Sequence, residues 1–334
     1  MTLNTDAAQS GAGWDTRPRK WSNDGSDILV PILRSGILAR EFCRHRPHAE
    51  VEAVFDRSIY LRSGDVFVCV GEPAIGNGAL TLIADFGISR PLANLGLCPG
   101  QPASISDRCI AIDDSVRFTF DRCVLWRQPR WPLSRSLREL NDLCSAIARQ
   151  IAFESPHEGL GRVVCLRQGG AGETPLARLA CPRIARFESW LFGALENHHV
   201  PITASPASIT DLIGLGPGLT PSGDDFLVGA LALLDALAER KAHAALVRVI
   251  AAIPRGLTSA LSECLLKTAA AGHVGENLSR AVSAVVSGMP DQAVAAIRKI
   301  GHSSGWDVMA GILTTLHVVA MRDARPSLSV ASIE

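Results

Sequence analysis

The sequence predicts an α+β protein in which a β-rich N-terminal domain, a small barrel or sandwich, precedes a larger α-helical domain. Two observations carry this prediction. Short runs rich in Val, Ile, Phe and Thr, separated by turn residues, fill residues 51–126, whereas apolar residues recur at helical spacing from residue 136 onward. A chain of 334 residues is long enough for two domains. The expected limits are a flexible lead-in at 1–27, a β-rich domain at 28–130 and a mainly helical domain at 131–330.

The first elements follow from local composition. Residues 1–27 are polar and rich in Gly, Ser and Asp, so we expect a flexible lead-in and no signal peptide. The apolar segment 28–42 predicts a short helix, although Pro31 and Gly36 weaken it. Within the β-rich region, the turn signals are Ser63-Gly64, Asn77-Gly78 and Asp113-Asp114.

The second half reads as one further strand followed by helices. The β-branched run RVVCLR at 162–167 predicts the strand. Apolar periodicity predicts helices over residues 136–152, 176–200, 223–240, 242–253, 257–271, 276–287, 290–300 and 305–321.

Composition excludes several function classes. The chain has 33 basic and 33 acidic side chains, and this zero balance is atypical of proteins that bind nucleic acid or membrane surfaces. Its nine cysteines include no C-x-x-C pair, which indicates neither a disulfide framework nor a zinc site. No apolar stretch reaches the roughly 20 residues that a membrane-spanning helix needs. We therefore expect a soluble, cytoplasmic protein.

The strongest chemical signal is GLGPGLTPSGDD at residues 214–225. Glycines at alternate positions let the backbone bend and approach a ligand closely. Thr220 followed by Pro221 predicts an N-cap and a first helical residue, and the following run FLVGALALLDALA predicts a helix that is buried on nearly all sides. A glycine loop that leads into a helix N-terminus is typical of anion sites.

Other interpretations of this motif exist. It is not a phosphate-binding P-loop, because no lysine lies between positions 20 and 241. A well-capped helix in which Asp224 and Asp225 only complement the helix dipole would need no such run of glycines. Two further roles stay open for these aspartates, namely binding Mg²⁺ or orienting a substrate amide.

A second motif, GHSSGWD at residues 301–307, resembles the first because small residues again precede an apolar helix. Ser303 or Ser304 can cap this helix, and Asp307 lies in its first turn. His302 is the natural candidate for proton transfer. Two such helix N-termini facing each other would form a pocket lined by N–H and hydroxyl donors. The pairing of the two motifs, more than either alone, indicates a functional site.

The segment between the motifs adds further candidates. Thr258 can cap a helix whose face carries Ser259 and Ser262, and Arg255 can meet a carboxylate or phosphate. An exposed arginine before an ordinary helix start is the competing interpretation.

The two motifs, 214–225 and 301–311, together resemble a bacterial family of domains of unknown function that includes a subunit of the oxamate carbamoyltransferase of allantoin degradation. The β-rich run VEAVFDRSIYL is also similar to that family. The resemblance implies a carbamoyltransferase-like subunit that handles small anionic substrates such as carbamoyl phosphate and oxamate, with companion subunits. Acyl transfer of this kind needs donors for phosphate and for the oxyanion of a tetrahedral intermediate. The zero net charge already indicates that neither nucleic acid nor a membrane is a partner.

Residue roles follow from the motifs and the resemblance together. The predicted catalytic residues are His302, Ser303 and Asp225. The predicted ligand-binding residues are Gly214, Gly216, Gly218, Thr220, Ser222, Gly223, Asp224, Arg255, Ser304 and Asp307. No cofactor is implied beyond Mg²⁺ as an open alternative. Two other functions compete: a Mg²⁺-dependent enzyme that handles phosphoryl groups or nucleotides, and a non-catalytic metabolite-binding or assembly subunit.

Overall fold

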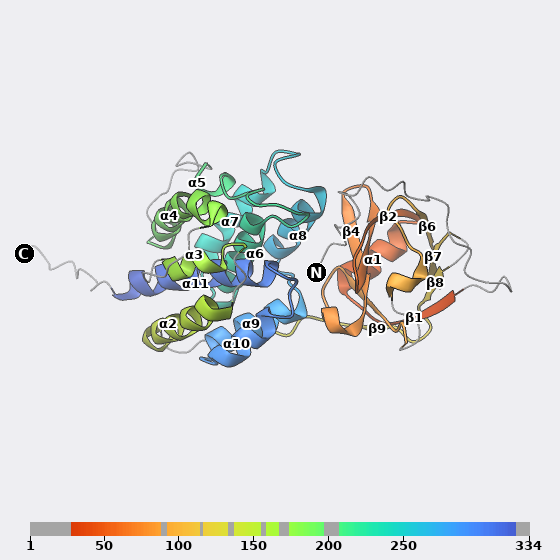
Figure 1. Ribbon diagram of the computed structural model, residues 1–334, viewed down its shortest axis with the longest axis horizontal. Coiled ribbons are helices and arrows are strands. Elements are labelled where there is room, and N and C mark those ends of the chain that lie inside the picture. Colours follow the sequence, from red (N-terminus) through yellow and green to blue (C-terminus); the bar gives the residue numbers. More distant parts are fainter. Residues whose placement is uncertain are drawn as a thin grey trace, which may run out of the picture. The chain divides into compact units, whose positions relative to one another are not determined.

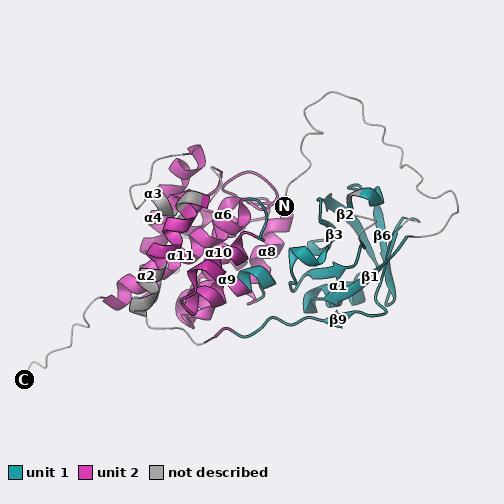
Figure 2. Ribbon diagram, turned by 60° about the horizontal axis from the view of Figure 1, so that its bottom comes forward, with its two compact units in different colours: residues 1–130, 273–279, 299–302 teal, residues 131–272, 280–298, 303–334 magenta. Residues whose placement is uncertain are grey.

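The protein divides into a barrel unit and a helical unit, shown in different colours in Figure 2. This computed structural model describes residues 28–87, 92–113, 116–132, 137–154, 158–166, 174–196 and 207–324. The predicted lead-in at 1–27 lies outside these ranges. The barrel unit contains residues 1–130, 273–279 and 299–302, and the helical unit contains residues 131–272, 280–298 and 303–334.

The predicted fold class is confirmed, and of the two predicted β architectures the barrel is the one formed. The strands are β1 (Ile28–Ser35), β2 (His48–Val54), β3 (Ser58–Ser63), β4 (Val66–Gly71), β5 (Thr81–Ala84), β6 (Pro102–Ile105), β7 (Cys109–Ile112), β8 (Val116–Thr119) and β9 (Val124–Leu125). Their order is β5-β4-β3-β2-β6-β7-β8-β1, and pairing of β1 with β5 closes the ring of eight. The short β9 pairs in parallel with Arg34 and Ser35 at the C-terminal end of β1.

Strand pairing around the barrel is mixed. Most neighbours are antiparallel, whereas β4 pairs with β5, and β1 with β8, in parallel. The predicted turn at Ser63-Gly64 joins β3 to β4, and Gly64 has a φ of 64° there. Asp113, with a φ of 45°, begins the turn between β7 and β8, whereas Asp114 lies outside the described residues. Asn77-Gly78 does not form a hairpin, because the two strands around it are parallel.

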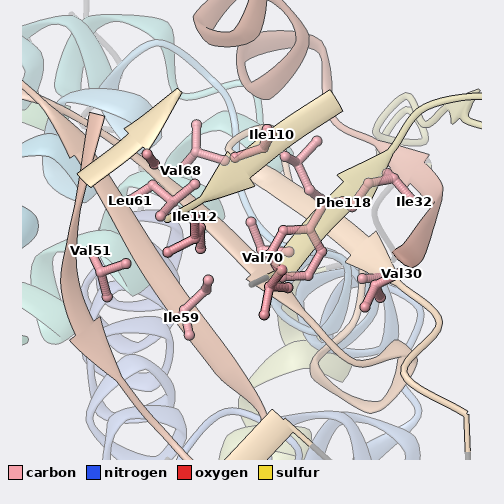
Figure 3. Packing of buried hydrophobic residues seen from close by; sticks show 14 of the residues in the cluster. Val30, Ile32, Val51, Ile59, Leu61, Val68, Val70, Ile110, Ile112 and Phe118 are labelled. Atoms are coloured by element: carbon pink, nitrogen blue, oxygen red, sulfur yellow. The ribbon is translucent and has the colours of Figure 1, made fainter. Parts of the chain in front are cut away.

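The barrel encloses its own hydrophobic core. Alternate residues of each strand point inward, as the period of two in a strand requires. Figure 3 shows members of this core from six strands, β1 to β4, β7 and β8: Val30, Ile32, Val51, Ile59, Leu61, Val68, Val70, Ile110, Ile112 and Phe118. All of them are less than 5% exposed.

The segment 28–42 departs from its predicted single helix. It forms β1, then Gly36, then helix α1 (Ile37–His45), which buries Ala39 and Phe42 against the barrel core. A strand tolerates Pro31, which the interior of a helix would not. Gly36 lies between the two elements as the N-cap of α1, and a side chain is excluded there because a Cβ would lie 1.9 Å from the Gly78 carbonyl oxygen.

The helical unit contains most of the remaining chain (Figure 1). Its helices are α2 (Leu137–Glu154), α3 (Gly161–Leu166), α4 (Pro175–Leu195), α5 (Ala207–Thr210), α6 (Ser222–Ala236), α7 (Arg240–Ala251), α8 (Ala260–Ala270), α9 (Glu276–Val286), α10 (Pro290–Ile297) and α11 (Ser304–Ala324), with the first residues of α9 counted in the barrel unit. The eight predicted helices correspond to α2, α4 and α6 to α11, with ends that differ by a few residues. The strand predicted at 162–167 is wrong, because this short apolar run forms α3. No helix in the described ranges has the length and hydropathy to cross a membrane.

Helix α11 runs through the middle of the helical unit and packs against α2, α3, α4, α6 and α10 (Figure 1). Its closest neighbour is α6, and both helices are buried on nearly all sides. The two backbones meet at glycines. A Cβ on Gly229 of α6 would lie 2.1 Å from the Val308 carbonyl oxygen, and a Cβ on Gly311 of α11 would lie 1.9 Å from that of Phe226.

Replacing Gly311 with alanine should therefore destabilise the helical unit. The new methyl group meets backbone atoms of α6, which cannot move aside as a side chain can, so we expect a loss of about 3 kcal/mol in the free energy of unfolding. The control Met321→Ala removes a half-exposed side chain from the same helix and should change stability by less than about 0.5 kcal/mol. Urea unfolding followed by far-ultraviolet circular dichroism measures both. Equal stability of the two variants would contradict the close crossing.

Candidate functional site

The two sequence motifs lie side by side, because they precede two helices that run parallel. Contacts between α6 and α11 advance in the same direction along both helices: the hydroxyls of Thr220 and Ser304 are 3.2 Å apart, and Phe226 meets Gly311 two turns further on. The predicted juxtaposition of the two N-termini is therefore present. It places the loop of residues 214–220, which we call the glycine loop, next to the start of α11.

The glycine loop has a backbone that other residues would not adopt readily. Gly214, Gly216 and Gly218 have φ values of 73°, 110° and 94°. These values lie in the left-handed region, where a Cβ is costly. The three differ in their surroundings: a Cβ on Gly214 would lie 2.2 Å from the Leu257 carbonyl oxygen, whereas one on Gly218 would meet no atom within 4 Å. The tip of the loop is thus open, and its start is tightly packed.

Hydrogen bonds hold both ends of this loop. At its start, the N–H of Gly214 donates to Oδ1 of Asp224 over 2.9 Å. Near its end, Oγ of Ser259 donates to the Leu219 carbonyl oxygen over 2.5 Å, and Ser259 is also the N-cap of α8. The loop shape therefore depends on the N-terminus of a third helix, α8, as well as on α6.

The N-cap of α6 lies one residue later than the predicted cap, Thr220. Its N-cap is Pro221 and its first residue is Ser222, so Thr220 is outside the helix and its hydroxyl meets Ser304. The N–H of Gly223 donates to the Leu215 carbonyl oxygen, and those of Asp224 and Asp225 donate to that of Pro221. These N–H groups are consequently engaged within the protein. Donors for a ligand must come mainly from the loop backbone and from the hydroxyls beside it.

Asp224 supports the loop. The residue is 1% exposed, and besides the Gly214 N–H its carboxylate accepts hydrogen bonds from the hydroxyls of Thr258 and Ser262, the latter over 2.6 Å. Burial raises the pKa of Asp224, while the three donors act in the opposite direction. Thr258, predicted as a helix cap, instead ties the start of α8 to this carboxylate.

Asp307 is buried in the first turn of α11 and is 1% exposed. Its Oδ1 accepts a hydrogen bond from the Leu160 N–H, and Ser222 also hydrogen-bonds to its carboxylate. Burial raises the pKa of Asp307 to about 6 despite these donors. The contact with Leu160 has no signature in the sequence, because every residue except proline carries a backbone N–H.

Asp225 lies between the two helix starts. Its carboxyl group forms hydrogen bonds with Ser304 and Thr220. Burial, and next the negative charge of Asp307, raise its pKa well above the ordinary value for an aspartate. Its Oδ2 atom is covered and has no hydrogen-bond partner among the described residues. Asp225 therefore differs from Asp224 and Asp307 in having one covered carboxyl oxygen without a hydrogen-bond partner among the described residues.

The remaining predicted residues are Ser303, His302 and Arg255. The Ser303 carbonyl oxygen accepts the N–H groups of Trp306 and Asp307 at the start of α11. His302 is exposed and belongs to the segment 299–302, which is counted with the barrel unit. Arg255 is exposed in the turn before α8. The hydrogen bonds described above involve neither His302 nor Arg255.

The described part of the chain contains no group of three or more His, Cys, Asp or Glu side chains placed to hold a metal ion. All three aspartates of the two motifs already form hydrogen bonds with other groups of the protein.

Comparison with known families identifies this part of the chain. Residues 212–316 match the family described as oxamate carbamoyltransferase subunit AllH. Over these residues the chain is similar to the AllH family. The matched region begins two residues before the glycine loop and ends within α11. It contains both motifs. The resemblance noted in the sequence is thereby confirmed. No solved structure matches the chain.

The pKa of Asp307 gives a pH test of the buried site. Because the folded protein binds this proton more tightly than the unfolded chain, the residue stabilises the fold at low pH, and that contribution is lost as the pH rises from about 4 to about 6. Relative to Asp307→Asn, which keeps an acceptor for the Leu160 N–H, the wild type should lose about 3 kcal/mol across this window. Urea unfolding of both proteins over a pH series measures this difference. If the free energies of unfolding of the two proteins change with pH in parallel, the raised pKa of Asp307 is contradicted.

Proposed function

We propose that this protein is a subunit of a carbamoyltransferase-type enzyme and that its glycine loop binds a small anionic substrate. The family description supports the first part, since AllH is described as a subunit of oxamate carbamoyltransferase. It also supports companion subunits for this chain. The observation that carries the second part is the open loop tip beside the paired starts of α6 and α11.

The loop tip supplies the donors that an anion needs. Backbone N–H groups in a loop with left-handed residues form a concave, anion-binding arrangement. Pro217 and Gly218 are exposed, so phosphate or carboxylate can approach the backbone there. Thr220 and Ser304 provide hydroxyls at the edge of the same site. Because the loop is held at both ends, these donors are positioned before the ligand arrives, which lowers the entropic cost of binding.

Chemistry at this site would follow the acyl-transfer pattern. We propose that loop donors stabilise phosphate and the oxyanion that forms when the carbamoyl carbon is attacked. Ser303 and His302 remain the proposed residues for the reacting carbonyl and for proton transfer. Asp224 and Asp307 would act indirectly, because they hold the loop and the start of α11 in place.

Turnover tests this function directly. Phosphate release from carbamoyl phosphate in the presence of oxamate would be measured with the purified chain alone, and again with the proteins encoded by neighbouring genes. We expect turnover when companion subunits are present. Turnover by the chain alone would make it a self-contained transferase. Absence of turnover in both, together with absence of oxamate and phosphate binding, would contradict the proposal.

Replacing Gly218 with valine should abolish anion binding without unfolding the chain. The β-branched side chain would cover the open tip. The control Gly272→Val causes a similar backbone strain, because Gly272 has a φ of 83° and a Cβ there would also meet no atom within 4 Å. Calorimetric titration with inorganic phosphate and with oxamate should give a Kd at least about tenfold higher for Gly218→Val only. Binding retained by a folded Gly218→Val protein would refute the role of the loop.

A further inference from the structure

The three aspartates of the two motifs differ in the kind of group that holds them. Asp224 and Asp307 each accept a hydrogen bond from a backbone N–H group, which can only donate, so both suit their ionised form. The carboxyl group of Asp225 instead meets two hydroxyls, those of Thr220 and Ser304. A hydroxyl can donate or accept, so these partners suit an ionised and a neutral carboxyl group equally.

Counting hydrogen atoms decides whether Asp225 carries a proton. The hydroxyl oxygens of Thr220 and Ser304 are 3.2 Å apart and hydrogen-bond to each other, besides bonding to Asp225. The three side chains thus form a closed triangle with three hydrogen bonds. Two hydroxyls supply only two hydrogen atoms, so the third must come from the carboxyl group. Because Oδ2 of Asp225 has no partner among the described residues, both of its contacts involve Oδ1, which donates in one and accepts in the other.

The electrostatic surroundings of Asp225 favour the same proton. Its Oδ2 atom is covered, and a covered acceptor without a donor costs more when it is charged than when it is neutral. Burial, and next the negative charge of Asp307 from α11, raise the pKa of Asp225. The charge of Asp224 on α6 adds to this increase, whereas the two hydroxyls act in the opposite direction. No titratable side chain of α7 or α8, which also pack against α6, is among the main causes.

The proton on Asp225 changes what the two hydroxyls can offer to a ligand. An ionised carboxylate would draw the hydrogen atoms of both hydroxyls to itself, and its charge would repel an anion at the neighbouring loop. A neutral carboxyl group needs neither hydrogen atom, because its own O–H donates within the triangle. The hydroxyls of Thr220 and Ser304 can then turn outward and donate to an anion at the glycine loop, which ends at Thr220.

We propose that Asp225 is a neutral carboxylic acid in the folded protein and that its proton frees the hydroxyls of Thr220 and Ser304 to bind an anion at the glycine loop. Asp225 is then a positioning residue, since it acts through the two hydroxyls. The first half of this inference stands without the proposed function, and the second half rests on it. Because the proton and the anion are linked, the anion affinity falls as the pH rises through the pKa of Asp225.

Infrared spectroscopy tests the protonation state. A neutral carboxylic acid has a C=O stretching band that a carboxylate lacks. At about pH 7, the spectrum of the wild type minus that of Asp225→Asn should contain this band, because ordinary aspartates are ionised and cancel. The control difference, wild type minus Asp211→Asn, should not, because Asp211 is an exposed carboxylate paired with Arg186. Absence of the band from the Asp225 difference would overturn the inference.

Sulfate binding tests the effect on the loop, because sulfate keeps the same charge near neutral pH, whereas phosphate titrates there. Calorimetric titration at about pH 7 should give Kd values for the wild type and Asp225→Asn within about twofold of each other, since both side chains are neutral. Removal of an ionised carboxylate would instead tighten sulfate binding at least about tenfold in the variant. A folded Asp225→Asn protein outside the twofold range, in either direction, would contradict the inference. Asp211→Asn should bind like the wild type.

A pH series joins the two measurements. As the pH is raised over the range in which circular dichroism shows a folded chain, sulfate binding by the wild type should weaken where the infrared band disappears, and Asp225→Asn should keep its binding. If the band persists throughout, the wild type should bind like the variant throughout. Sulfate binding that survives the loss of the band would refute the link between proton and anion.

Two further outcomes separate this inference from the proposed function. A wild type that binds neither sulfate nor oxamate at any pH would contradict the proposed function and the second half of the inference, while the infrared band would still decide the state of Asp225. If Asp225→Asn does not fold, the wild type decides alone. A band that remains above the pKa of about 6 of Asp307, and that disappears together with sulfate binding, is the expected result.

Discussion

The close crossing of α6 and α11 is the contact on which the site depends. Gly229 and Gly311 allow the two backbones to touch, and parallel packing from that point brings the starts of both helices to the same place. Two motifs that are about eighty residues apart in the chain thereby share one network. A larger residue at either glycine would separate the helices and, with them, Thr220 from Ser304. Packing in the core of the helical unit thus determines the geometry of its surface loop.

The network that results is unusual in its charge. Three aspartates occupy the first turns of two helices, where the helix dipole favours negative charge, yet burial raises the pKa of each. Hydroxyls and backbone N–H groups, rather than cations, compensate two of them. The glycine loop is consequently held by buried polar contacts on one side while its tip stays open on the other. An enzyme that must present backbone donors to a small anion needs this combination of a rigid base and an accessible tip.

Much of the fold could be predicted because its signals are local. Helical periodicity identified the long helices, and the glycine and serine motifs identified the starts of α6 and α11. The failures have physical reasons. Residues 162–167 are too few to distinguish a strand from a helix by periodicity. Within 28–42, Pro31 and Gly36 accompany a change from strand to helix, whereas the apolar composition of the segment predicts a single short helix. The N–H of Leu160 and the distinct surroundings of Asp224, Asp225 and Asp307 depend on tertiary packing, which residue types alone do not encode.

A crystal structure of the protein with bound oxamate would test most directly whether the glycine loop binds a small anionic substrate. We predict that the carboxylate of oxamate lies against the backbone of Gly216 and Gly218, with Thr220 and Ser304 still in contact. Oxamate bound away from the glycine loop would contradict this binding mode.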